Sequence, residues 1–242
     1  MSDPGDVRAG TISDFWRAVV IGLVRRVFGP ALSLRVTGTE NVPLAGPLIV
    51  VSNHLSNADP PILIVAFPRP LFFMGKAELF RNPVLAWLVR KFGGFPVERG
   101  TADRAALRHA LNVLNQGIAL GIFPEGGRSK TGALRTGLPG VGLLALQSGA
   151  PILPVGLTGT EVFPVNGDWP LRRPPGQPRG VGVRFGVPFV VPERVDGRRV
   201  TADEATRLIM TRVAELLPEP YRGVYASSES SSPAEPARSA SR

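Results

Sequence analysis

His54 and Asp59 are the first residues of this chain whose types and spacing suit chemistry. Both lie in the segment NHLSNAD, residues 53–59, which follows an apolar run. A carboxylate on one ring nitrogen of an imidazole fixes the tautomer and supports positive charge on the ring, so the other nitrogen can act as a general base. Their spacing is too long for a shared helical face, and a turn must fold Asp59 back. Such a pair needs no serine or cysteine if the substrate's own hydroxyl is the nucleophile.

A structural role for both residues is the alternative, and on spacing alone it is the favoured one. A single histidine at the end of a strand is usually structural. Asp59 precedes Pro60, so it also suits the N-cap of a helix with proline at the first helical position. The pattern by itself leaves the catalytic and the capping interpretations of Asp59 open.

The segment FPEGGRSKTG, residues 123–132, is the second one whose residue types suit a binding or catalytic role. Gly126 and Gly127 let the backbone approach a ligand closely. Arg128 and Lys130 add positive charge that suits a phosphate. The order of residues is not that of a P-loop. A glycine-rich turn with solvated cations is the alternative interpretation.

Two further cations, Lys76 and Arg99, each follow a predicted strand. Ligand-facing loops of α/β sheets lie at that position, although either residue also suits a plain surface charge. His109 differs from His54, because it belongs to a predicted helix over 101–117 and faces away from its leucine stripe. We expect His109 to be exposed to solvent and to have no catalytic role.

Short apolar runs alternate with helical patterns between residues 32 and 217. This alternation predicts an α/β domain with a mainly parallel sheet flanked by helices. The predicted strands are 32–38, 47–53, 70–75, a brief strand within 93–100, 118–123, 150–159 and one or two strands within 181–191. The predicted helices of this region are 59–67, 83–93, 101–117, 138–149 and 201–217.

The composition narrows the function classes. The chain has 242 residues, no cysteine and two histidines, so thiolate chemistry is excluded and no zinc-site spacing is present. Its net charge of +9 favours anionic partners, but only 3 of the 28 basic residues are lysines, which is also typical of a biased genome composition. Aromatic and basic residues are not interleaved as on a nucleic-acid platform, and we expect no nucleic-acid partner.

Together these segments resemble the 1-acylglycerol-3-phosphate acyltransferases and the wider glycerolipid acyltransferase superfamily. Four motifs occur in the family's order: NHLSNAD, then GGFPVER with KAELF upstream, then FPEGGRS, then PILPVGL. The resemblance covers roughly residues 32–217. Gly127 stands where the family most often has threonine, which we expect to change loop rigidity more than chemistry.

The resemblance implies that His54 is a general base for the hydroxyl of lysophosphatidic acid, which attacks an acyl thioester. Asp59 becomes its orienting partner, and Glu125 organises the loop or binds the hydroxyl. Acyl-CoA or acyl-carrier protein is the implied donor, phosphatidic acid the product, and neither a cofactor nor a metal is required. The alternatives are an acyltransferase for another lysophospholipid or lyso-lipid, and a non-catalytic lipid-binding protein. The implied substrate-binding residues are Lys76, Arg99, Glu125, Gly126, Gly127, Arg128 and Ser129.

Four parts follow from this assignment: a flexible arm over 1–12, an amphipathic helix over 13–29, the acyltransferase domain over 30–223 and a disordered tail over 224–242. Ser13 caps the helix and Gly29-Pro30 stops it. Trp16 and three arginines suit the membrane interface, while packing on the domain is the alternative. The start is polar and unlike a signal peptide, and no segment has the ~18 apolar residues of a spanning helix. We expect peripheral or monotopic association with the cytoplasmic face of the cell membrane.

Overall fold

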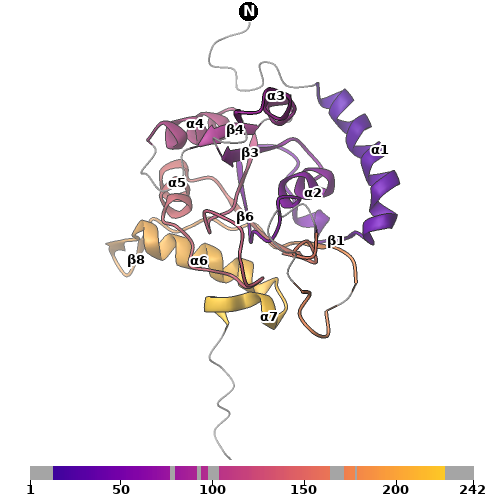
Figure 1. Cartoon of the computed structure of the whole chain (residues 1–242). Helices are drawn as coiled ribbons and strands as arrows, with labels where there is room; N and C mark the ends of the chain where they lie inside the picture. Colours follow the sequence, from indigo (N-terminus) through magenta and orange to yellow (C-terminus); the bar gives the residue numbers. More distant parts are fainter. Residues whose placement is uncertain are drawn as a thin grey trace, which may run out of the picture.

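A seven-stranded sheet is the centre of the chain in the computed structural model, which describes residues 13–76, 80–91, 94–97, 104–163, 172–177 and 179–226. The strand order is β1-β7-β6-β2-β5-β3-β4 (Figure 1). The strands are β1 Arg35–Thr37, β2 Leu48–Ser52, β3 Leu71–Lys76, β4 Gly94–Val97, β5 Ala119–Ile122, β6 Ile152–Thr158 and β7 Gly182–Phe185. Every pairing is parallel except that of β6 with β7. The predicted mainly parallel α/β fold is therefore confirmed.

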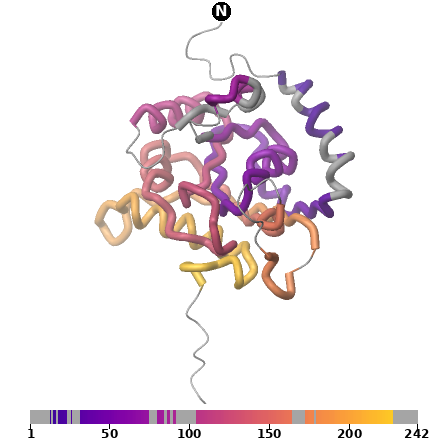
Figure 2. The backbone as a smooth tube through the Cα atoms, viewed as in Figure 1, coloured from indigo at the N-terminus to yellow at the C-terminus, as the bar shows by residue number. Residues whose placement is uncertain are grey.

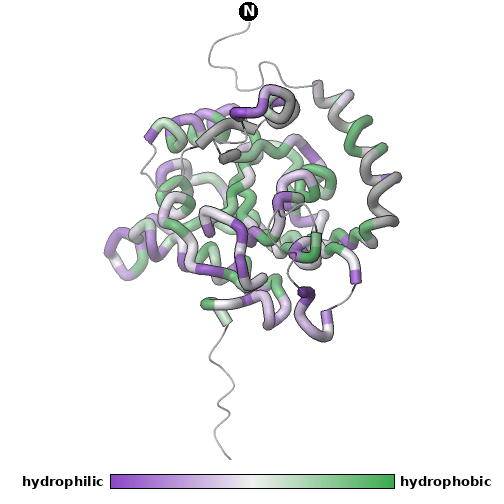
Figure 3. Tube along the Cα trace, in the orientation of Figure 1, coloured by the Kyte–Doolittle hydropathy of each residue, from purple (hydrophilic) through white to green (hydrophobic). Residues whose placement is uncertain are grey.

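Helices cover both faces of this sheet (Figures 1 and 2). The helices are α1 Asp14–Leu32, α2 Asp59–Ala66, α3 Pro83–Lys91, α4 Arg104–Asn115, α5 Gly140–Ser148, α6 Ala202–Glu215 and α7 Glu219–Arg222. β2 shows how the layers form, because its side chains alternate between the two faces. Ile49 and Val51 pack with residues of α4, α5 and α6, whereas Leu48 and Val50 pack with residues of α2. Both faces carry apolar side chains, as a buried parallel sheet requires. The strands in the centre of the molecule accordingly have hydrophobic residues along much of their length (Figure 3).

The first helix is longer than predicted. α1 continues through Gly29-Pro30 to Leu32, because a proline one turn before a helix end removes a single backbone donor. The Leu32 carbonyl accepts from the Val181 N–H, and the Arg35 N–H donates to the Val181 carbonyl. These two bonds join the end of α1 to the sheet edge. The N-terminal prediction holds, since Ser13 Oγ accepts from the Trp16 N–H at 3.5 Å.

The last third of the chain departs most from prediction. Of the one or two strands predicted within 181–191, β7 forms over only four residues, and beyond Pro188 only an isolated bridge of Phe189 with Ile152 follows. β7 runs antiparallel to β6. A small hairpin, β8 Arg194–Val195 with β9 Arg198–Arg199, follows and was not predicted. Asp196 takes a positive φ at its tip.

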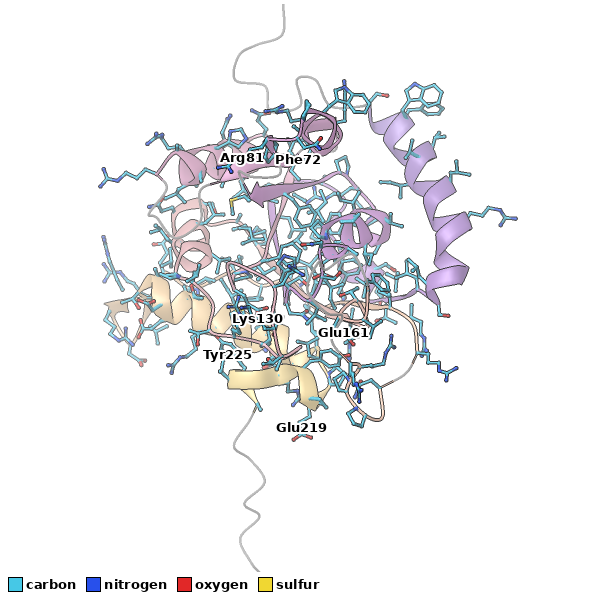
Figure 4. All side chains as sticks on the ribbon, in the orientation of Figure 1. Phe72, Arg81, Lys130, Glu161, Glu219 and Tyr225 are labelled. Carbon is cyan, nitrogen blue, oxygen red and sulfur yellow. The ribbon has the colours of Figure 1, made fainter. Side chains whose placement is uncertain are left out.

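The boundary of the predicted disordered tail is wrong by at least three residues. Gly223–Tyr225 form a 3-10 helix, and the Val224 N–H donates to the Leu134 carbonyl. Tyr225, labelled in Figure 4, accepts from the Gly137 N–H through its hydroxyl at 3.3 Å. The rest of the predicted tail, 227–242, and the predicted arm, 1–12, lie outside the described residues. No helix within the described part of the chain has the length and hydropathy to cross a membrane.

Candidate active site

The His54 loop lies at the carboxyl edge of the sheet, between two parallel neighbours. β2 ends at Ser52 and pairs with β5 on one side and β6 on the other. The carboxyl ends of parallel strands meet at one edge, where ligand-binding loops of α/β sheets gather. The segment after β5 and the segment after β6 therefore both reach the loop 53–59.

The Asp59 carboxylate is fully buried and holds this loop in its turn. Its Oδ2 accepts from three donors: His54 Nδ1 at 2.9 Å, the Leu55 N–H at 2.6 Å and the Ser56 N–H at 2.7 Å. Its Oδ1 accepts from the Thr160 hydroxyl at 2.5 Å. An ionised carboxylate only accepts hydrogen bonds, so it matches four donors.

Asp59 is not a capping residue by its side chain. The residue at the N-cap of α2 is Ala58, which makes no side-chain capping bond, and Asp59 is the first residue of the helix. The carboxylate instead turns back over the preceding loop, because two backbone N–H groups and an imidazole of that loop donate hydrogen bonds to it. Of the two interpretations that the sequence left open for Asp59, the geometry favours the partner of His54.

The His54 ring is buried and oriented from two directions. Nδ1 donates to Asp59, since an ionised carboxylate cannot donate, so the tautomer that suits this contact has its lone pair on Nε2. The ring stacks on Phe123, with centroids 4.2 Å apart and planes inclined by 20°. A carboxylate on Nδ1 and a free lone pair on Nε2 are what general-base catalysis requires of an imidazole.

The FPEGG loop fixes the His54 backbone on the β5 side. The His54 N–H donates to Glu125 Oε1 at 3.0 Å, and the His54 carbonyl accepts from the Ser129 N–H at 2.7 Å. Both groups of one peptide residue are thus satisfied by the neighbouring loop. His54 keeps its place through its main chain, independently of its side chain.

The second oxygen of Glu125 is bound by a residue that sequence reasoning missed. Glu125 Oε2 accepts from the Arg135 N–H at 3.1 Å and lies 3.5 Å from Arg135 Nε. Arg135 Nη2 also donates to the carbonyls of Glu125 and Gly127, at 2.9 and 2.8 Å. Burial raises the pKa of the Glu125 carboxyl, while the donors from His54 and Arg135 oppose that rise. Arg135 lies outside the quoted motifs, and nothing in its spacing signals this contact.

The β6 side anchors the loop through Asn53. Its amide donates to the Leu157 carbonyl at 2.9 Å and accepts from the Leu157 N–H at 2.8 Å. The Asn53 side chain thereby extends the hydrogen-bonded contact between β2 and β6 by one residue beyond the end of β2. Asn53, which precedes the catalytic candidate His54, therefore has a structural role that the sequence did not reveal.

Four of the predicted substrate-binding residues follow Glu125 on the FPEGG loop, and the structure describes all four. Ser129 is buried, and its hydroxyl donates to the Ala133 carbonyl at 2.7 Å, so its side chain shapes the loop. Gly126 has φ 68°, a conformation that favours glycine, and Gly127 and Arg128 are half-buried beside it.

The remaining predictions concern cations and the second histidine. Lys76 is the last residue of β3, but its side chain is not described, and Arg99 lies outside the described residues. Lys130, labelled in Figure 4, is exposed. His109 is exposed on α4 as predicted, and its partial burial lowers its pKa.

An apolar pocket of about 160 Å³ adjoins the pair. Phe123 forms part of its wall and also stacks on the His54 ring. The wall comes from the ends of β3 and β5, the FPEGG loop and the start of α5. Its residues are Met74, Ile122, Phe123, Pro124, Gly126, Leu138, Gly140 and Val141.

The buried pair of His54 and Asp59 lies at the edge of a mainly parallel sheet, and the sequence that contains it matches the profile of a protein family. The profile described as Acyltransferase matches residues 33–158, just over half of the chain. The chain belongs to the acyltransferase family. Its similarity to particular proteins is to 1-acyl-sn-glycerol-3-phosphate acyltransferases. That of Borreliella burgdorferi is 35% identical over 134 residues, which are 54% of this chain and 54% of that protein.

A solved structure and a second kind of relative complete the comparison. The crystal structure of the 1-acyl-sn-glycerophosphate acyltransferase of Thermotoga maritima has a TM-score of 0.61, with 25% identity over 83% of this chain and 79% of that one. The lyso-ornithine lipid O-acyltransferase of Pseudomonas aeruginosa is 34% identical over 113 residues, 46% of this chain and 43% of that protein. The chain spans about half the length of the curated relatives it matches.

Proposed function

We propose that this protein transfers a fatty acyl group from acyl-CoA or acyl-carrier protein to the sn-2 hydroxyl of 1-acyl-glycerol-3-phosphate, giving phosphatidic acid. The observation that carries the proposal is the buried contact of His54 Nδ1 with Asp59 Oδ2 at 2.9 Å. The names of the relatives from B. burgdorferi and T. maritima support this acceptor. The product belongs to phospholipid synthesis.

The chemistry follows from the two nitrogens of His54. Nε2 takes the proton of the acceptor hydroxyl as its oxygen forms a bond to the thioester carbonyl carbon. The carbon–sulfur bond then breaks, and the leaving thiolate takes the proton from Nε2. Asp59 stabilises the imidazolium that exists between these two steps. Protons and bonds balance, so His54 returns to its starting form without a metal or a covalent acyl-enzyme.

The apolar pocket supports an acyl substrate. Its wall is mostly apolar, and Phe123 belongs to this wall and also stacks on the His54 ring. Burying apolar surface yields about 25 cal/mol per Å², so a hydrocarbon chain is the class of ligand that this pocket favours.

Arg128 is our principal candidate for the acceptor phosphate, with Lys76 and Arg99 as further candidates. Arg128 follows two glycines on the loop that holds the His54 backbone. A guanidinium suits two phosphate oxygens at once. Glu125, Gly126, Gly127 and Ser129 then shape the loop from which Arg128 extends.

Arg128→Ala is expected to raise the KM for lysophosphatidic acid far more than the KM for the acyl donor. Losing a charge-assisted contact costs ~1.5–3 kcal/mol, or roughly ten- to 150-fold in affinity. Steady-state kinetics with each substrate varied in turn measure both constants. Lys130→Ala, which removes an exposed cation two positions away, is the matched control. Unchanged acceptor kinetics in Arg128→Ala would exclude Arg128 as a phosphate ligand.

A lyso-lipid without a phosphate is the second candidate acceptor. The observation in its favour is the similarity to the lyso-ornithine lipid O-acyltransferase of P. aeruginosa, which matches nearly as well in identity as the B. burgdorferi protein. The same His54 chemistry serves any acceptor hydroxyl, so only the head-group contacts distinguish the two.

Product analysis tests the proposed function directly. Purified protein is incubated with lysophosphatidic acid or lyso-ornithine lipid, each with acyl-CoA and acyl-carrier donors of several chain lengths. Phosphatidic acid as the main product supports the proposal. Acylated ornithine lipid alone would shift the acceptor, and no acylated product with any pair would refute acyl transfer to either acceptor.

Peripheral or monotopic association with the cytoplasmic face of the cell membrane belongs to the same proposal. α1 contacts α2, yet its N-terminal half presents large apolar side chains to solvent. Phe15, Trp16 and Leu23 are 69%, 61% and 64% exposed. Exposed apolar groups of this size on one helix favour the membrane interface.

Replacing Phe15, Trp16 and Leu23 together by serine is expected to lower binding to anionic phospholipid vesicles at least tenfold without unfolding the domain. Each side chain buried in the interface contributes up to ~1.5–3 kcal/mol. Vesicle sedimentation and a melting curve measure the two effects. The control replaces Val187 and Val190, which are equally exposed but lie after β7. Equal sedimentation of the serine variant and the wild type would contradict the assignment.

A further inference from the structure

Thr160 makes a contact with the catalytic pair that none of the quoted motifs contains. Its hydroxyl donates to Asp59 Oδ1 at 2.5 Å, and both residues are fully buried. The other three donors to Asp59 all converge on Oδ2. The two carboxylate oxygens therefore have different partners, and Oδ1 is bound by Thr160 from a distant part of the chain.

The position of Thr160 is determined by the end of β6. Gly159 follows this strand with φ 86°, and a Cβ there would lie 2.1 Å from the Gly180 carbonyl oxygen. Only glycine fits both conditions, and its turn directs the next residue over the His54 loop. β6 itself is aligned with β2, since Asn53 is bound to both backbone groups of Leu157. Thr160 thus sits on a rigid strand end.

The segment beyond Thr160 is also held. Glu161, labelled in Figure 4, is fully buried, and its Oε1 accepts from the Tyr221 hydroxyl at 2.8 Å. Tyr221 is the buried residue of α7. A backbone anchored at Gly159 and at Glu161 leaves the Thr160 side chain little freedom to move away from Asp59.

We propose that Thr160 is a positioning residue for acyl transfer, which acts by fixing the rotation of the Asp59 carboxylate. The terminal torsion of aspartate has a broad, roughly two-fold profile, so a carboxylate held on one oxygen can still turn. A donor on Oδ1 keeps the carboxylate plane directed at His54 Nδ1 and so holds the proton on that nitrogen. The inference rests on the proposed function and deepens it.

Thr160→Val is the principal test, because valine keeps the branched shape and removes the hydroxyl. The kcat is expected to fall roughly ten- to hundredfold, which corresponds to the loss of a hydrogen bond to a charged group. The KM values of both substrates are expected to stay within about twofold. Thr158→Val, the same change two positions earlier on β6, is the matched control and is expected to leave kcat unchanged.

A second pair of variants covers the case in which valine disturbs the fold. Thr160→Ser and Thr160→Ala both lack the methyl group and differ only in the hydroxyl. The serine variant is expected to recover most of the wild-type kcat, and the alanine variant to match valine. Equal kcat values for the serine and alanine variants would overturn the inference.

Nitrogen-15 NMR of the imidazoles supplies a readout that loss of packing does not imitate. The chain has two histidines, so a His109→Gln background leaves His54 as the single signal. In the wild type the neutral ring is expected to carry its proton on Nδ1, and in Thr160→Val a mixture of tautomers is expected. Unchanged tautomer and unchanged kcat in Thr160→Val would overturn this inference alone, whereas a wild type that transfers no acyl group would overturn the proposed function.

Discussion

Asp59→Asn is expected to lower kcat for acyl transfer by about a thousandfold and to leave the melting temperature nearly unchanged. The structure explains both the expected loss of activity and the expected unchanged stability. The three donors that meet at Oδ2 can meet at an amide oxygen, and the amide nitrogen can donate to the Thr160 hydroxyl, which rotates. The hydrogen bonds that hold the loop therefore survive the substitution.

What asparagine cannot supply is the negative charge beside the imidazolium. At a separation of about 4 Å and an effective dielectric constant of about 20, that interaction amounts to roughly 4 kcal/mol, or about a thousandfold in rate. The measurements are kcat with saturating substrates and a thermal melt of each protein. A folded and fully active Asp59→Asn would show that the pair is not catalytic, and our central assignment would be wrong.

His54→Ala is expected to lose at least ~10²–10⁴ in rate, the usual contribution of a general base. The domain is expected to stay folded, since Glu125 and Ser129 bind the backbone of His54 and these bonds do not need the imidazole. His54→Gln, which keeps a donor for Asp59, is the variant that separates loss of the base from loss of a packed ring.

The double variant of His54 and Asp59 gives the sharper result. Residues that act as one unit are not additive, so His54→Ala combined with Asp59→Asn is expected to be little worse than His54→Ala alone. His109→Ala, the other histidine, is the control and is expected to keep wild-type activity because its side chain is exposed on α4. Multiplicative losses in the double variant would argue for two independent roles.

The central strands and the catalytic candidates were predictable because local patterns encode them. β2, β5 and β6 are short apolar runs between turns, and such runs signal buried strands without any knowledge of their neighbours. His54 and Asp59 lie five positions apart, so a single turn decides their contact. The antiparallel partner of β6 was not predictable, because hydrophobic patterns do not carry strand direction.

The supporting contacts were not predictable, because they join distant parts of the chain. Thr160 lies 101 positions from Asp59, and Asn53 lies 104 positions from Leu157. No periodicity relates residues at such separations, and the four quoted motifs do not include Thr160. The sequence therefore indicated the candidate catalytic residues but not the contacts that hold them in place.

The bond between Gly137 and Tyr225 has a consequence for biosynthesis. It spans 88 positions, and its companion bonds link Leu134 to Tyr221 and Val224. Contacts of such separation form late, because a long stretch of chain must be ordered first. A nascent chain lacks these partners until residues 221–225 have been synthesised, so Leu134 and Gly137, which flank Arg135, stay without these bonds until then. The proposed acyl-transfer site is therefore expected to be completed only after all seven strands of the main sheet, which end at Phe185, have been synthesised.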